Sequence, residues 1–67
     1  MSSNPFIDYL VDDIRKELGD QAQFVYQKVE QPLAMALIRA AGLAGFKADI
    51  EWNAPAFRTM NIIVRQA

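Results

Sequence analysis

Residues 20–31, DQAQFVYQKVEQ, decide the fold of this chain because they fit two different elements. Asp20, followed three residues later by Gln23, is a variant of the capping box that begins many helices. Apolar residues then recur at helical spacing, through Val25 and Val29 and onward past residue 31. This pattern favours a helix over residues 21–44 that is bent or briefly broken at Pro32, whose ring displaces the preceding helical turn.

The same segment also has the composition of a strand. The sequence FVYQKVE is rich in β-branched and aromatic residues, and a strand over residues 23–29 would lead into a helix that begins near Pro32. Such a strand needs a turn before the helix, and Glu30-Gln31 is a weak turn sequence. We therefore prefer the long kinked helix; the alternative gives the element order αβαββ.

The N-terminal segment is simpler to interpret. Asn4 is a good helix N-cap, and Pro5 stands at the first helical position, where its missing N–H costs nothing. Apolar residues recur from there at helical spacing until Gly19, which offers a left-handed stop. The sequence therefore predicts a helix over residues 4–18, and this helix forms a helical hairpin with the second one.

The C-terminal third predicts a β-hairpin. Apolar and polar residues alternate over residues 46–52 and again over residues 58–65, and the segment NAPAF between them supplies a turn. Placing Trp52 opposite Arg58 makes the apolar faces of the two strands coincide, with Trp52 closing the core. The expected fold is thus a single small α+β domain over residues 1–67, in which the helical hairpin packs on a two-stranded antiparallel hairpin.

Composition limits the ways in which so short a chain can be stabilised. It has 67 residues and neither cysteine nor histidine, so it lacks disulfides and the commonest zinc ligand. A chain of this length buries only about 60% of the surface that its unfolded form exposes. Of the usual ways to stabilise a small domain, oligomerisation is the one that remains. We expect a homodimer, without a metal or a cofactor.

Charge and hydropathy argue against two classes of partner. Seven basic and eight acidic side chains give a net charge of −1, which provides no field to attract nucleic acid or anionic lipid. The longest strongly apolar run, residues 32–46, contains Arg39 and is shorter than the ~20 residues of a membrane-spanning helix. The N-terminus shows no secretory signal. These patterns predict a cytoplasmic protein that binds neither membrane nor nucleic acid; a DNA-associated regulator remains an alternative.

The run QPLAMALIRAAGLAGF, residues 31–46, is apolar on nearly every side when it is drawn as a helix. Such a helix has to be buried on all sides, and one short helix and one hairpin cover only about half of it. We expect a second copy or a partner to cover the remaining face. The residues predicted for that interface are Met35, Ala36, Ile38, Ala40, Leu43 and Ala44.

The sequence predicts binding rather than catalysis. It has no Cys or His to form a nucleophile–base pair, and Asp8, Asp12 and Asp13 fit a solvated helix face that complements the helix dipole. We expect these acids to steer a basic partner, while Phe57 and Arg58 at the hairpin tip supply burial. The predicted function is a small non-enzymatic accessory protein, of the phage or mobile-element type, that modulates or inhibits a larger protein. The alternative is a structural subunit that self-assembles.

Overall fold

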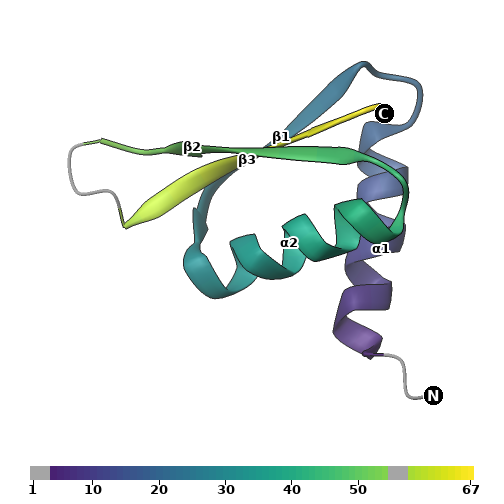
Figure 1. Cartoon of the computed structure of the whole chain (residues 1–67), viewed down its shortest axis with the longest axis horizontal. Coiled ribbons are helices and arrows are strands. Elements are labelled where there is room, and N and C mark those ends of the chain that lie inside the picture. The colour runs from purple at the N-terminus through teal and green to yellow at the C-terminus, as the bar shows by residue number, and fades with distance from the viewer. Residues whose placement is uncertain (1–3, 55–57) are drawn as a thin grey trace.

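The computed structural model describes residues 4–54 and 58–67. In chain order the elements are α1 (Pro5–Leu18), β1 (Gln23–Glu30), α2 (Gln31–Leu43), β2 (Lys47–Trp52) and β3 (Thr59–Arg65). The three strands form one antiparallel sheet in the order β1-β3-β2, so β3 lies in the middle. The helix α2 lies along one face of the sheet, here called the inner face, and α1 packs mainly against α2 (Figure 1). The α+β class predicted from the sequence is confirmed.

Residues 23–30 form a strand, so the prediction of a kinked helix over residues 21–44 is wrong and the alternative order αβαββ is confirmed. The β-branched and aromatic composition of the segment outweighs its helical spacing. Pro32 lies in the first turn of α2, where no N–H is needed, instead of in a helix interior, where it would cost about 3 kcal/mol. The predicted two-stranded hairpin is therefore part of a three-stranded sheet.

The remaining elements begin and end close to where the sequence places them. The side-chain oxygen of Asn4 accepts hydrogen bonds from the N–H groups of Phe6 and Ile7, at 3.0 and 3.4 Å, and caps α1. Gly19 ends α1 with a φ of 52°, a backbone conformation that favours glycine.

The hairpin forms in a different register from the predicted one. Trp52 lies opposite Met60 rather than Arg58, so the pairing is displaced by two residues. A displacement by two residues keeps every side chain on its face of the sheet. The predicted assignment of residues to the two faces is therefore unchanged.

The core lies between the inner face of the sheet and the two helices. Its members come from every element except β2, and three of the four buried residues of α2 are alanines, which let the helix approach its neighbours closely. The buried residues are Ile7, Leu10, Ile14, Leu18, Val29, Ala34, Leu37, Ala40, Ala41, Met60, Ile62 and Val64.

The strand β1 contains a β-bulge, where its register with β3 shifts between Tyr26 and Val29. Lys28, in this bulge, has a φ of 54°, which is unfavourable for a residue with a Cβ atom. Its N–H donates a hydrogen bond to the side-chain oxygen of Asn61 at 3.1 Å, and the same oxygen accepts a bond from the side-chain amide of Asn53 at 3.2 Å. Asn61 thus connects the bulge in β1 to the β2–β3 hairpin.

Lys28→Gly is expected to raise the free energy of unfolding by roughly 0.5–1 kcal/mol, because glycine adopts the left-handed conformation without strain. Gln27→Gly is the matched control at the neighbouring position, where φ is not positive. There glycine adds only conformational entropy to the unfolded chain and should lower the free energy of unfolding by a similar amount, roughly 0.5–1 kcal/mol. Urea denaturation measures both; shifts of the same sign would contradict the assignment of strain to Lys28.

Candidate protein-binding surface

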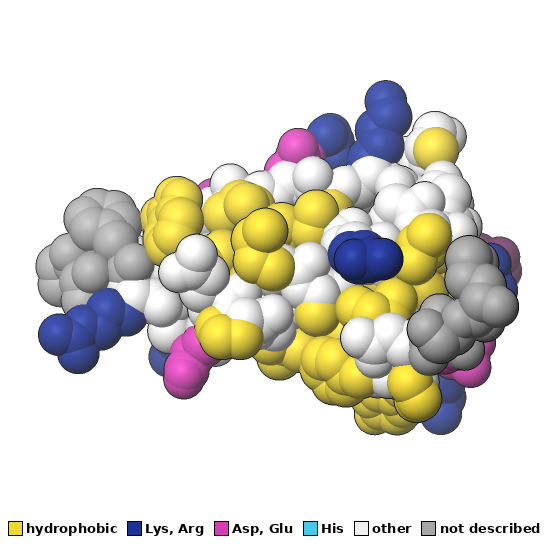
Figure 2. All heavy atoms as spheres, turned by 60° about the horizontal axis from the view of Figure 1, so that its bottom comes forward, with side chains coloured by type: hydrophobic (Ala, Val, Ile, Leu, Met, Phe, Trp, Pro, Cys, Tyr) yellow, Lys and Arg dark blue, Asp and Glu magenta, His cyan; other side chains and the backbone are white. Residues whose placement is uncertain are grey.

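Seven large apolar side chains are 39–64% exposed in the part of the chain that the structure describes. They come from α1, α2 and β2, and we call them the apolar surface. Figure 2 shows hydrophobic side chains spread over the helix side of the molecule, with a basic side chain among them. The residues of the apolar surface are Phe6, Tyr9, Leu33, Met35, Leu43, Ile50 and Trp52. Large apolar side chains that are exposed together on one side of a small chain are a candidate interaction surface.

The strand β2 contributes to this surface because the helices cover its inner face only near Ala48 and leave the part toward Trp52 uncovered. Ile50 and Trp52 lie directly opposite the buried residues Ile62 and Met60, on the same face of the sheet. Nevertheless, they are 44% and 50% exposed. Figure 1 shows the reason: β2 is an edge strand, and the β2–β3 hairpin extends beyond the N-terminal end of α2. The expectation that Trp52 closes the core is therefore wrong.

The residues predicted for an interface between copies divide into two groups. Met35 and Leu43 are well exposed and belong to the apolar surface, at 58% and 64%. Ala36, Ile38 and Ala44 are partly buried, and the first two pack against the core. Ala40 is fully buried, so its place in the predicted interface is wrong. The cause is that α2, beginning only at Gln31, turns its alanine-rich side toward the sheet and α1.

The described residues among those predicted for partner binding do not lie together. Asp8 and Asp12 are exposed on α1, and Arg58 is exposed at the start of the hairpin's second strand; Phe57 lies outside the described residues. Figure 1 places α1 at one end of the longest axis and the far end of the hairpin at the other. The described residues of the two groups therefore lie at opposite ends of the molecule, and their joint role in docking stays a prediction.

Asp13 has a structural role that its spacing in the sequence did not reveal. The hydroxyl of Tyr26 donates a hydrogen bond to a carboxylate oxygen of Asp13 at 2.8 Å, which ties β1 to α1. Burial of the phenol, and then this hydrogen bond to the carboxylate, raise the pKa of Tyr26 above its ordinary range. The ring of Tyr26 also meets that of Phe24 edge to face, with centroids 5.0 Å apart.

Tyr26→Phe should lower the free energy of unfolding by about 1 kcal/mol at neutral pH, because Asp13 loses its donor. The raised pKa adds a second signature. Above pH ~10 the unfolded chain releases the phenol proton while the folded chain keeps it, so stability falls as the pH rises. Tyr26→Phe should weaken this alkaline loss, whereas Tyr9→Phe, on an exposed side chain, should keep it. Thermal melts from pH 7 to 11 test both, and equal curves for the two variants would contradict the role of Tyr26.

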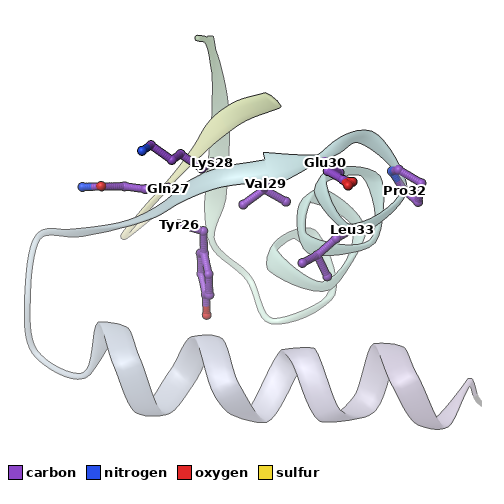
Figure 3. Close-up of a pocket in the computed structure, with 7 residues that line it drawn as sticks. All are labelled: Tyr26, Gln27, Lys28, Val29, Glu30, Pro32 and Leu33. Atoms are coloured by element: carbon purple, nitrogen blue, oxygen red, sulfur yellow. The ribbon is translucent and has the colours of Figure 1, made fainter. Parts of the chain in front are cut away.

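A hollow of about 550 Å³ lies where β1 leads into α2. Figure 3 shows Tyr26 pointing toward α1, while Gln27 and Lys28 point away from it. The apolar walls include Val29 and Leu33, and the complete lining is Tyr26, Gln27, Lys28, Val29, Glu30, Pro32 and Leu33. This hollow could not be predicted from the sequence, because it forms only when residues 23–30 are a strand.

Other kinds of site find little support in the residues that the structure describes. Within residues 4–54 and 58–67, no three or more Asp, Glu, His or Cys side chains gather as a metal site requires. Neither α1 nor α2 is long and apolar enough to cross a membrane. The chain matches no protein-family model, no curated protein and no solved structure.

Proposed function

We propose that the protein is a small non-enzymatic homodimer that binds a larger protein and modulates its activity. The observation that carries this proposal is the apolar surface, whose seven large side chains compare with twelve buried core residues in the described part of the chain. Burial of apolar area stabilises a folded chain, and a short chain has little of it to bury. Binding a partner would remove these exposed side chains from water and so add to the stability of the bound state.

The chemistry of the accessible groups supports binding over catalysis. The phenol of Tyr26, held by Asp13 and with a raised pKa, keeps its proton and is a poor base. The chain offers neither a thiol nor an imidazole to act as nucleophile or base.

The acidic residues of α1 favour a partner whose binding surface is basic. Asp8 and Asp12 are both exposed near the N-terminal half of α1, and Phe6 and Tyr9 of the apolar surface stand beside them in the helix. Exposed charges of one sign accelerate encounter with a surface of opposite sign, while apolar side chains slow dissociation.

Two variants of the apolar surface test the proposal against a matched control. Met35→Glu and Leu43→Glu each add one negative charge to the apolar surface, whereas Gln23→Glu adds the same charge to an exposed site on β1. A specific partner from cells that carry the gene should be retained by the wild-type protein and Gln23→Glu, and lost with both other variants. Far-UV circular dichroism checks that all four fold alike. Retention that does not differ among them would contradict the proposed binding surface.

The homodimer is tested separately by sedimentation equilibrium. The wild-type protein should approach twice the 7.6 kDa chain mass at micromolar concentration. A single chain mass at all concentrations would contradict the homodimer but not the binding of a larger protein.

The alternative of a self-assembling structural subunit is less well supported. Open-ended assembly through the sheet would require two edges that accept strands, and the bulge at Lys28 interrupts the edge of β1. A scattering mass that rises without limit as the concentration rises would favour this alternative over the closed dimer.

A further inference from the structure

The two outer edges of the sheet differ in how readily they accept another strand. The edge of β1 is interrupted by its bulge, and the N–H of Lys28 turns back toward Asn61. In contrast, β2 pairs with β3 in one unbroken register from Lys47 to Trp52 and contains no glycine or proline. An edge strand without a bulge or a proline is a ready template for strand pairing.

The hydrogen-bond pattern identifies the backbone groups on the outer edge of β2. The N–H of Asn53 donates to the carbonyl of Thr59 at 3.0 Å, in the register in which Trp52 lies opposite Met60. Hydrogen-bonded and non-hydrogen-bonded residue pairs alternate along an antiparallel ladder. Every second residue before Asn53, namely Glu51, Asp49 and Lys47, therefore also directs its backbone N–H and C=O toward β3. The backbone groups of Ala48, Ile50 and Trp52 therefore point to the outer edge, where no strand of the described chain pairs.

We propose that β2 pairs antiparallel with β2 of a second copy, so that the two sheets become one continuous sheet of six strands. Ala48 of each copy then lies opposite Ile50 of the other. This inference rests on the proposed homodimer and names its interface.

Charge disfavours two of the registers with two-fold symmetry. Pairing through the outer backbone groups places one residue of β2 opposite its own copy on the axis. If that residue were Ile50, Asp49 would face Glu51 twice; if it were Glu51, two glutamates would meet. Like charges directly opposite each other destabilise a strand pair, so both registers are disfavoured.

With Asp49 on the axis, Lys47 of each copy faces Glu51 of the other, which gives two attractive pairs. The two Asp49 side chains do meet, but each already forms an ion pair with Arg65 of its own chain. A register with Ala48 on the axis would also pair opposite charges, but it would leave Trp52 beyond the end of the partner strand.

Burial favours the same register. The inner faces of both copies lie on the same side of the joined sheet, because the two-fold axis stands perpendicular to it. Trp52 of each copy then falls opposite Phe46 of the other, in the turn that follows the exposed Leu43. The half-exposed side chains of β2 thus gain neighbours that their own helices do not supply.

A charge-swap series tests the interface, with each variant serving as control for the others. Lys47→Glu and Glu51→Lys, made singly, replace two attractive pairs by two repulsive ones and should raise the dimer Kd about tenfold or more in low salt. The double variant K47E/E51K restores the attraction and should return the Kd to within about threefold of the wild-type value. Sedimentation equilibrium measures the Kd, and circular dichroism confirms that all chains fold.

Single cysteines test the register, because the native chain has none. Asp49→Cys places a thiol opposite the same thiol of the second copy. The two residues form a non-hydrogen-bonded pair of the ladder, whose Cα separation of about 4.5 Å suits a disulfide. Mild oxidation should cross-link Asp49→Cys and leave Lys47→Cys and Glu51→Cys largely uncoupled.

The possible failures are distinguishable. A wild-type chain that stays monomeric overturns both the homodimer and this interface. A dimer that ignores the charge swaps and does not cross-link at position 49 overturns this interface alone, because the copies must then associate through another surface. A dimer that responds to the swaps but cross-links through Glu51→Cys instead of Asp49→Cys overturns the register.

Discussion

Ala40→Glu is expected to unfold the protein. Ala40 is completely buried on the side of α2 that faces the core, and the described core contains no buried polar or charged residue that could pair with a new carboxylate. Burying an unpaired carboxyl group in such a place costs more than about 4 kcal/mol, which approaches the entire stability of a small domain. Far-UV circular dichroism should show loss of both helix and sheet at 25 °C.

Met35→Glu is the matched control for this prediction. It introduces the same side chain into the same helix, at a position that is 58% exposed. It should remain folded, with a melting temperature within a few degrees of the wild-type value. A folded Ala40→Glu variant with wild-type stability and an altered mass in solution would instead place Ala40 at an interface between copies, as the sequence alone predicted.

Leu37→Ala is expected to have the second largest effect, a loss of about 2–5 kcal/mol in the free energy of unfolding. The side chain of Leu37 is 1% exposed and belongs to the core between α2, α1 and the sheet. Removing it takes away buried apolar area and leaves a cavity that a core of this size fills only in part.

Leu43→Ala provides the comparison, since it makes the same chemical change in the same helix at a side chain that is 64% exposed. In dilute protein it should change the free energy of unfolding by less than about 0.5 kcal/mol. Urea denaturation followed by circular dichroism measures both variants. Equal losses for Leu37→Ala and Leu43→Ala would show that α2 is rotated from the orientation described.

Elements with strong local signals were predictable from the sequence. Asn4 and Gly19 mark the two ends of α1, and each does so by hydrogen bonds to residues within one helical turn of itself. The alternation of apolar and polar residues identifies β2 and β3. The strand β1 was misread for a physical reason. Val25 and Val29 are four residues apart, as on one face of a helix, but the extra residue at the bulge places them on opposite faces of the sheet. A bulged strand can therefore imitate a helix in its apolar pattern.

The candidate site depended on information that is not local. The exposure of Trp52 follows from the edge position of β2 and from the length of α2, neither of which alternation reveals. The contact between Tyr26 and Asp13 requires β1 to be a strand beside α1, so it could not be predicted once residues 21–44 were taken as one helix. Met35 and Leu43 are exposed because a short helix with apolar residues on all sides exceeds what its neighbours can cover, and their place in an interface stays a prediction.

The central position of β3 has a consequence for the kinetics of folding. Gln23 pairs with Arg65, so β1 meets β3, its one strand neighbour among the described residues, across a long segment that includes α2 and β2. Helices and the β2–β3 hairpin can form from nearby residues, but β1 gains its backbone partners only after a large loop closes, which carries a high entropic cost. The rate-limiting barrier should therefore include the closure of this loop, and substitutions in the β1–β3 ladder should slow refolding, whereas those in the first turn of α1 should mainly accelerate unfolding.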